Sequence, residues 1–387
     1  MRPFAFFTHH QGRGHIRRCE AIMRALDDRP ITVLCADPDA FTVPDDRVTI
    51  VPLPNMIGDR SATVALHQQA TPDAMHCVPL GSEKLRANAT TIVDVFHRVN
   101  PALFFVDVSA EWTLLARLCS VPAVKVRMHG DRSDPGHVAA YQSAVSLVAP
   151  YDAAIEQDDY PAWARRKTFY SGGLCTTTDA VPDRATARQR LGLPETQEVI
   201  VTLAGGGGAG TPFAPLTMAA RALPDAQWLT IGPVTHEGHE TEFANLHNCG
   251  WVNNPLDYLA AADVVIASAG DNTVHEIARV GRPFLCIPEW RYFDEQVAKA
   301  DALAKAGAAA VRATWPASSA QWRDSIAAAR AIDLDRQKRL FNPDAAAAIA
   351  AHLIETAAML WERAPASTES NVVRLESGTD IARPRAS

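Results

Sequence analysis

The chain has 387 residues, which at roughly 150 residues per domain predicts two to three domains. Hydrophobic residues make up 47% and charged residues 21%, which excludes a wholly disordered or fibrous protein. Lys and Arg number 37 against 44 for Asp and Glu, and the net charge of −7 has the wrong sign for a protein that lives on nucleic acid or anionic lipid.

Short apolar runs alternate with helical spacing through the first half of the chain. We expect strands over 3–8, 31–36, 48–53, 102–108 and 123–128, and helices after the first loop and over 82–99 and 111–119. Strands separated by helices predict right-handed crossovers and a parallel sheet that is covered on both faces.

A second series of strands and helices follows a Pro- and Gly-containing connection, 171–195. We expect strands over 199–203, 227–231, 263–267 and 283–287, and helices over 212–222, 255–261, 272–280 and 293–306. Because the connection interrupts the alternation, two doubly wound domains fit better than an eightfold barrel. The predicted units are a first domain, a second domain, a C-terminal helix and a disordered tail, at 1–175, 176–345, 346–364 and 365–387.

The cysteines and the apolar windows indicate the compartment. The seven cysteines include no C-x-x-C pair, and the N-terminus has no secretory apolar segment, which indicates reduced thiols and a cytoplasmic location. The most apolar long window, 345–360, is shorter than the ~20 residues of a membrane span. We therefore expect no transmembrane helix.

The first candidate site is the loop between the first strand and the first helix, which contains Gly12-Arg13-Gly14-His15. Ligands bind there in open α/β sheets, because strand ends and helix N-termini converge. Arg17 stands where a dinucleotide fingerprint has its third glycine, which disfavours NAD. The positive end of the helix favours a neutral imidazole at His15, and such an imidazole can act as a base. Alternatively His15 only caps the helix, and His9 and His10 are equally near in sequence.

An acidic residue follows the fourth expected strand. Asp107 ends the apolar run 103–107, at the same sheet edge as His15, so a His–Asp dyad is geometrically plausible. The alternative is that Asp107 caps the helix that begins near Glu111. The basic cluster Arg13, Arg17, Arg18 and Arg24 is interpreted as a solvated helix face, with contact to an acidic acceptor or a weak peripheral membrane contact as the alternatives.

Three loops of the second half lie at the corresponding edge. Residues 268–276 run from a strand into a helix, and their small residues and helix start offer an anion site for a diphosphate. The loop Gly205–Gly208 is a second anion-binding candidate, although no G-K-[ST] follows it as in a P-loop. Asp294 and Gln296 begin the helix after strand 283–287, where they could bind sugar hydroxyls. The first loop could instead be an ordinary capped helix start, and Asp294 an ordinary first-turn acid.

An ordered block in the second half resembles GT-B glycosyltransferases, particularly family 28 and its macrolide and plant relatives. The block runs from Trp251 through Asp257-Tyr258-Leu259 and Ser268-Ala269-Gly270 to Glu276, Gly281-Arg282-Pro283, Pro288 and Asp294-Glu295-Gln296. The resemblance implies two Rossmann-like domains that face an interdomain cleft. It also implies that Glu276 takes the ribose hydroxyls and that Gln296 reaches the donor sugar.

The resemblance implies an inverting, metal-independent transfer from a UDP- or TDP-sugar to a hydroxyl acceptor, small or lipid-linked, with no cofactor and no nucleic acid. Its catalytic residues would be His15 and Asp107, and His10 and His129 are expected to bind the acceptor. The expected donor-binding residues are Gly14, Gly206, Gly207, Ser268, Ala269, Gly270, Asn272, Thr273, Glu276, Asp294 and Gln296.

Two other functions stay open at this point. The segment Gly12–Cys19 is also similar to the G-x-G-H-x-x-R-C of nucleotide-sugar hydrolases of the pseudaminic acid pathway, so a hydrolase or an epimerase of the same fold is the alternative. The larger N-terminal domain, which includes 129–150, favours the transferase because it has room for an acceptor site. A non-catalytic nucleotide-sugar binding protein is the third reading.

Overall fold

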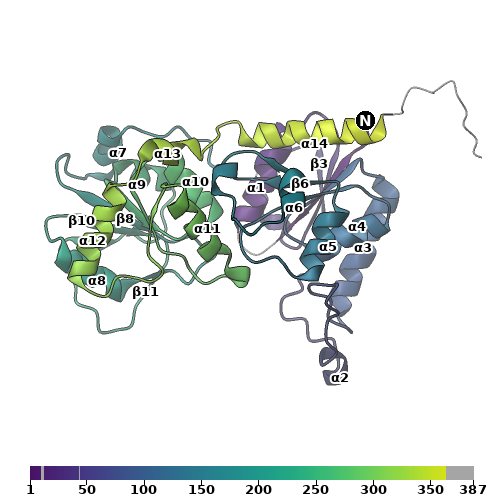
Figure 1. Ribbon diagram of the computed structural model, residues 1–387, viewed down its shortest axis with the longest axis horizontal. Coiled ribbons are helices and arrows are strands. Elements are labelled where there is room, and N and C mark those ends of the chain that lie inside the picture. Colours follow the sequence, from purple (N-terminus) through teal and green to yellow (C-terminus); the bar gives the residue numbers. More distant parts are fainter. Residues whose placement is uncertain (10–12, 43, 363–387) are drawn as a thin grey trace, which may run out of the picture.

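The computed structural model describes residues 1–9, 13–42 and 44–362, and the predicted disordered tail lies outside these residues. Two α/β domains lie side by side, each built on a parallel sheet, as the sequence predicts (Figure 1). Among the described residues, no helix combines the length and the apolar character that crossing a bilayer requires.

The first domain has a seven-stranded parallel sheet in the order β3-β2-β1-β4-β5-β6-β7. Its strands are β1 (Phe4–Thr8), β2 (Ile31–Cys35), β3 (Val48–Pro52), β4 (Leu103–Val106), β5 (Ala123–Val126), β6 (Ser146–Ala149) and β7 (Thr168–Tyr170). Its helices are α1 (Arg13–Ala25), α2 (Val64–His67), α3 (Glu83–Val99), α4 (Ala110–Leu118), α5 (Pro135–Ser143) and α6 (Ala162–Arg166).

Helices cover both faces of this sheet, whose central strands β2, β1 and β4 are buried at every position. Along β1, Phe4 and Phe6 point into one core and Ala5 and Phe7 into the other, and all four are buried. The core behind Phe4 and Phe6 contains α1, and the opposite core contains α3 and α4.

The second domain has a six-stranded parallel sheet in the order β12-β10-β8-β13-β14-β15 and a small two-stranded sheet, β11-β9. Its strands are β8 (Val199–Leu203), β9 (Thr211–Pro212), β10 (Gln227–Ile231), β11 (Val234–Thr235), β12 (Leu246–Asn248), β13 (Val264–Ala267), β14 (Phe284–Cys286) and β15 (Ala310–Val311). Its helices are α7 (Arg184–Leu191), α8 (Phe213–Ala222), α9 (Pro255–Ala261), α10 (Asp271–Val280), α11 (Glu295–Lys305), α12 (Ser319–Arg330) and α13 (Leu334–Arg339).

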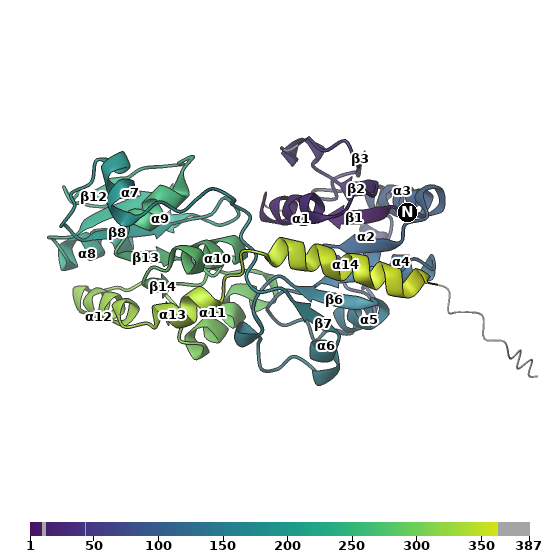
Figure 2. The ribbon, with the colours of Figure 1, turned by 90° about the horizontal axis from the view of Figure 1, so that it is seen from above.

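The last helix, α14 (Ala345–Trp361), returns to the first domain. It lies along that domain in both views (Figures 1 and 2), and its Ile349 and Leu353 are part of the same core as Phe4 and Phe6. At its end, Trp361 Nε1 donates a hydrogen bond to the carbonyl of Ala102 at 2.9 Å. The chain therefore crosses between the two domains twice.

Both sheets have a point where the strand order reverses. In the first sheet, β1 pairs with β2 on one side and with β4 on the other, and in the second sheet β8 lies between β10 and β13. Ligands of open α/β sheets bind at the carboxyl ends of such strands. These two switch points carry the predicted His15, Asp107, Gly205–Gly208 and Ser268–Gly270 segments.

Candidate functional site

His15 and Asp107, predicted separately from two strand ends, are in contact. His15 lies in the first turn of α1, and Asp107 directly follows β4. His15 Nδ1 lies 2.8 Å from Asp107 Oδ2, and the carboxylate is fully buried whereas the His15 side chain keeps 23% of its surface exposed. The pair therefore presents the imidazole to solvent and hides the carboxylate behind it.

A buried arginine completes this pair. Arg18 Nη2 donates to Asp107 Oδ1 at 2.5 Å. Burial alone would raise the pKa of Asp107, but the charges of Arg18 and His15, and their hydrogen bonds to the carboxylate, hold that pKa well below its usual range. Because an ionised carboxylate only accepts hydrogen bonds, the proton between the pair is assigned to Nδ1. The second ring nitrogen of His15, Nε2, is then the basic one.

Arg18 corrects one prediction. Only 4% of Arg18 is exposed, so it is not part of a solvated helix face, although Arg17 and Arg24 are exposed as expected. Two acidic partners, Asp107 and Asp271, compensate its burial. No sequence pattern near Arg18 announces these partners.

The backbone at the end of β4 is strained. Val108 has a φ of 84°, a region that a β-branched residue rarely occupies. Lys125 Nζ donates to the carbonyl of Val108 at 2.5 Å. Ser109, and not Asp107, caps α4, since its side chain accepts a hydrogen bond from Trp112 N at 3.2 Å. The alternative role of Asp107 as a helix cap is therefore wrong, and strain is held beside the dyad.

On the second domain, the turn between β13 and α10 presents the start of a helix. Gly270 is the N-cap residue of α10, and no side chain caps this helix end. The backbone amides of the first turn, including those of Asn272 and Thr273, therefore receive no hydrogen bond from a side chain at the N-cap position. Uncapped amides at a helix start can bind an anion.

Two predicted donor-binding groups of this region are already engaged. The side-chain oxygen of Gln296 accepts hydrogen bonds from the amides of Ala269 at 3.2 Å and Glu289 at 2.8 Å. Gln296 is also buried. The side-chain oxygen of Gln296 thus ties two loops together, and the donor-binding roles of Ala269 and Gln296 stay predictions.

Glu276 lies on α10, one turn beyond the helix start. Its Oε1 accepts a hydrogen bond from Thr177 Oγ1 at 2.7 Å. Burial raises the pKa of Glu276, and the Thr177 hydrogen bond and the Arg279 charge oppose this effect. A carboxylate with one held oxygen and one further acceptor site is suited to a pair of hydroxyl groups.

The glycine loop between β8 and β9 leaves space for backbone to approach a ligand. A Cβ atom on Gly206 would lie 3.3 Å from the ring of Trp251, and one on Gly208 would lie within 3 Å of the Glu289 carboxylate, whereas Gly207 has open space around it. Trp251 itself is 66% exposed. The predicted Gly206–Gly207 segment is therefore accessible and flanked by an exposed ring.

The sites of the two domains meet. A Cβ atom on Gly14 would lie 3.2 Å from Nδ2 of Asn272, and Arg18 Nη1 donates to Asp271 Oδ2 at 3.3 Å. Loops at the switch points of both sheets thus face each other across the domain boundary. The His15–Asp107 pair lies beside the N-terminus of α10.

Two other predicted residues are placed elsewhere. His129 is fully buried, and its Nε2 lies 2.7 Å from the carbonyl oxygen of Ile155, so its predicted acceptor contact is wrong in this arrangement. Asp294 is exposed, has a φ of 52°, and lines a separate groove of about 350 Å³ with Asp131 and Asp158. His10 lies outside the described residues.

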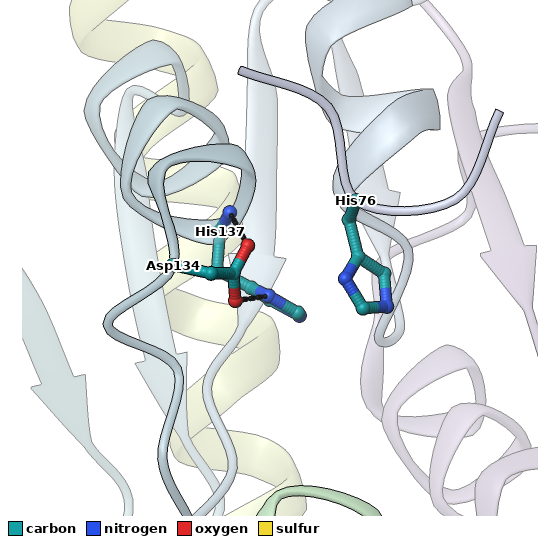
Figure 3. Close-up of side chains that lie close together, drawn as sticks. All are labelled: His76, Asp134 and His137. Carbon is teal, nitrogen blue, oxygen red and sulfur yellow. Dashed lines mark hydrogen bonds and ion pairs between the residues drawn. The ribbon is translucent and has the colours of Figure 1, made fainter. Parts of the chain in front are cut away.

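One further cluster, between α5 and the segment that precedes α3, has the composition of a metal site. Ligand atoms of His76, Asp134 and His137 lie within 4.8 Å of one another, and Figure 3 shows His76 opposite the Asp134–His137 pair. However, Arg132 Nη1 lies 3.5 Å from His137 Nε2, where a cation would be repelled. The ring of Phe293 packs against both histidines, at centroid distances of 5.2 Å and 5.1 Å. We interpret this cluster as part of the domain boundary.

Comparison with known proteins agrees with this geometry. Residues 231–338 match the glycosyltransferase family 28 C-terminal domain. A UDP-N-acetylglucosamine–N-acetylmuramyl-(pentapeptide) pyrophosphoryl-undecaprenol N-acetylglucosamine transferase of Sorangium cellulosum is 38% identical over 114 residues, which are 28% of each chain. The enzyme of the same name from Thermus thermophilus is 29% identical over 182 residues, 44% of this chain and 50% of the relative. The matches thus span half or less of these relatives.

The fold likeness extends over nearly the whole chain. The crystal structure of the glycotransferase of kitacinnamycin superimposes with a TM-score of 0.63 at 16% identity, over 92% of this chain and 98% of that one. At this identity the likeness establishes the fold. The chain therefore has the fold of the GT-B glycosyltransferases, and residues 231–338 of its second domain match the glycosyltransferase family 28 C-terminal domain.

Proposed function

We propose that the protein is a glycosyltransferase that moves a sugar from a UDP- or TDP-sugar to a hydroxyl acceptor, with inversion and without a metal ion. The observation that carries the proposal is the position of the His15–Asp107 pair beside the N-terminus of α10, with Gly14 against Asn272. A base in one domain and an anion site in the other are the two parts that such a transfer needs. The matched family domain supports a glycosyl donor.

In the proposed reaction His15 Nε2 takes the proton of the acceptor hydroxyl as its oxygen attacks the anomeric carbon. The buried Asp107 carboxylate holds Nδ1 and stabilises the imidazolium that forms. General base catalysis of this kind contributes typically ~10²–10⁴-fold. A single displacement by the activated hydroxyl inverts the anomeric configuration.

The leaving nucleoside diphosphate is assigned to the start of α10 and the glycine loop. The uncapped helix N-terminus supplies amides and positive potential, and Glu276 would accept hydrogen bonds from the ribose hydroxyls. Both carboxylates beside this helix start, Asp107 and Asp271, are paired with Arg18, and Asp271 also with Lys299. They are therefore poorly suited to hold a divalent cation, which supports a metal-independent reaction.

The acceptor would lie on the first domain, on the exposed side of His15. The names of the two sequence relatives include a pyrophosphoryl-undecaprenol acceptor. We therefore propose a hydroxyl acceptor that is a small molecule or is lipid-linked, with weak peripheral membrane contact in the second case. All seven cysteines are free, and Cys77 is exposed, which supports a reducing, cytoplasmic compartment.

The test is a product assay with UDP- and TDP-sugars, each with and without a panel of hydroxyl acceptors. We expect a glycoside of inverted anomeric configuration by NMR, formed only with acceptor and unchanged by EDTA. Stoichiometric free sugar without acceptor would instead indicate the hydrolase. Donor binding with no turnover for any acceptor would indicate a binding protein, and either result would overturn the proposal.

A further inference from the structure

Arg18 joins the two domains at the candidate site. Its guanidinium group is buried, and it donates from Nη2 to Asp107 Oδ1 at 2.5 Å and from Nη1 to Asp271 Oδ2 at 3.3 Å. Asp107 belongs to the first domain, whereas Asp271 is the first residue of α10 in the second domain, 253 positions away from Arg18. One side chain thus contacts the dyad and the helix assigned to the diphosphate.

The connection continues on the far side of Asp271. Its other carboxylate oxygen is paired with Lys299, which is fully buried on α11. The chain of contacts His15–Asp107–Arg18–Asp271–Lys299 contains two carboxylates, the Arg18 guanidinium group and the Lys299 amine, whose pKa is lowered by burial to about 7. Buried ion pairs are costly unless every partner is present, so this chain is complete only when the two domains are in contact.

The geometry makes Arg18 more than a counter-ion for Asp107. Arg18 Nη2 also lies 3.0 Å from His15 Nδ1, and with the proton on Nδ1 both nitrogens donate to the same carboxylate, so a shift of Arg18 would displace the carboxylate that holds the ring. A guanidinium fork can hold two carboxylates in fixed directions, whereas a lysine ammonium is a point charge on a flexible stem. If α10 moved away, Arg18 would lose Asp271 and with it one of the two directions that fix its plane.

We propose that Arg18 is a positioning residue that couples the docking of α10, through Asp271, to the orientation of the His15–Asp107 pair. Arg18 does not touch the substrate; it acts through Asp107. The expected effect on kcat rests on the proposed function, whereas the effect on the orientation of the His15 ring does not. The dyad is then held in its working orientation when the donor helix is in place.

The test compares Asp271→Asn and Arg18→Lys with Arg17→Lys, an exposed neighbour on the same helix, as the matched control. Asp271→Asn removes the charge that engages Arg18 and leaves Asp107 untouched. We expect kcat to fall about 10- to 100-fold in both variants, with donor KM near wild type, because small displacements of a catalytic group carry penalties of this size. Asp271→Asn should also lower the Tm, since it leaves the buried Lys299 and one arm of Arg18 without a carboxylate, so kcat is measured well below the Tm of each variant. Arg17→Lys should match wild type.

The double variant tests the coupling itself. If Arg18 acts through Asp271, Arg18→Lys combined with Asp271→Asn should lose no more kcat than the worse single variant. Multiplicative losses, unchanged kcat in Asp271→Asn, or a loss confined to donor KM would overturn the inference.

A spectroscopic readout separates this inference from the proposed function. In ¹⁵N-histidine NMR the wild-type His15 ring should be in the Nδ1-protonated tautomer, and Asp271→Asn should give a mixture of tautomers. This change would support the positioning role even if no acceptor is ever turned over. An unaltered tautomer in both Asp271→Asn and Arg18→Lys would contradict the positioning role even if the wild-type protein is an active transferase.

Discussion

Truncating Leu353 to alanine tests whether α14 belongs to the core of the first domain. Leu353 is only 1% exposed and lies in the core that also contains Phe6 and Ile22. Removing a fully buried leucine side chain destabilises a domain by about 2–5 kcal/mol, through lost burial and the cavity that remains. In a domain of this size that corresponds to a decrease in Tm of roughly 5–15 °C.

The assay is chemical and thermal denaturation, followed by near-UV circular dichroism. Leu360→Ala is the matched control, since Leu360 is on the same helix but 39% exposed, and we expect it to lose less than about 1 kcal/mol. Equal losses for the two variants, or a loss below about 1 kcal/mol for Leu353→Ala, would refute the assignment of α14 to this core.

Three further variants test the surroundings of the site. Val108→Gly should stabilise the protein by about 1 kcal/mol, because glycine adopts a φ of 84° without strain. The control Val106→Gly, in the buried strand, should destabilise it. A lower Tm for Val108→Gly than for wild type would contradict backbone strain at Val108. Burial lowers the pKa of Lys125 to about 7. Between about pH 7 and pH 10 the unfolded chain therefore binds more protons at this lysine than the folded chain does. The contribution of Lys125 to stability should rise with pH over this range, by at most about 1.4 kcal/mol per pH unit. Urea titrations at pH 7 and 9 should show a smaller rise of the unfolding free energy with pH in Lys125→Met than in wild type. An equal rise in the two proteins would contradict the lowered pKa of Lys125. A donor at 100 times its Kd should stabilise the wild-type protein by about 2.7 kcal/mol and raise its Tm, and Glu276→Ala should abolish this rise. A rise of wild-type size in Glu276→Ala would contradict the assignment of Glu276 to the ribose.

The parallel sheets were predictable because their strands are buried on both faces. Runs such as Leu103–Val106 and Val199–Leu203 are apolar at nearly every position, which is typical of a covered parallel sheet. One of the elements that sequence reasoning missed lacks this signal. The helix Arg184–Leu191, inside the predicted connection, has only three apolar residues, and contacts with α9 stabilise it instead.

The site was predictable as far as topology determines it. His15, Asp107 and the Ser268–Gly270 turn were found because strand ends of parallel sheets lie at one edge. Arg18 was misplaced because its burial depends on Asp271 in the other domain, and no local pattern carries that information.

Loop geometry determines where Asp294 and Gln296 lie. Asp294 follows Phe293, and both residues have positive φ values, 52° and 64°, which turn the loop toward the domain boundary. The sequence does not predict this conformation, because neither residue is glycine. The hydrogen bonds from two backbone amides to the Gln296 side-chain oxygen depend on the same loop, and the sequence does not predict them either.

The most direct test of the central claim is the single-turnover rate of sugar transfer in His15→Ala, measured together with donor affinity. The exposed His97 on α3 supplies the control variant, His97→Ala. We predict a decrease in rate of about 10²- to 10⁴-fold with donor Kd unchanged, and wild-type behaviour for the control. A His15→Ala protein that transfers sugar at the wild-type rate would contradict the account.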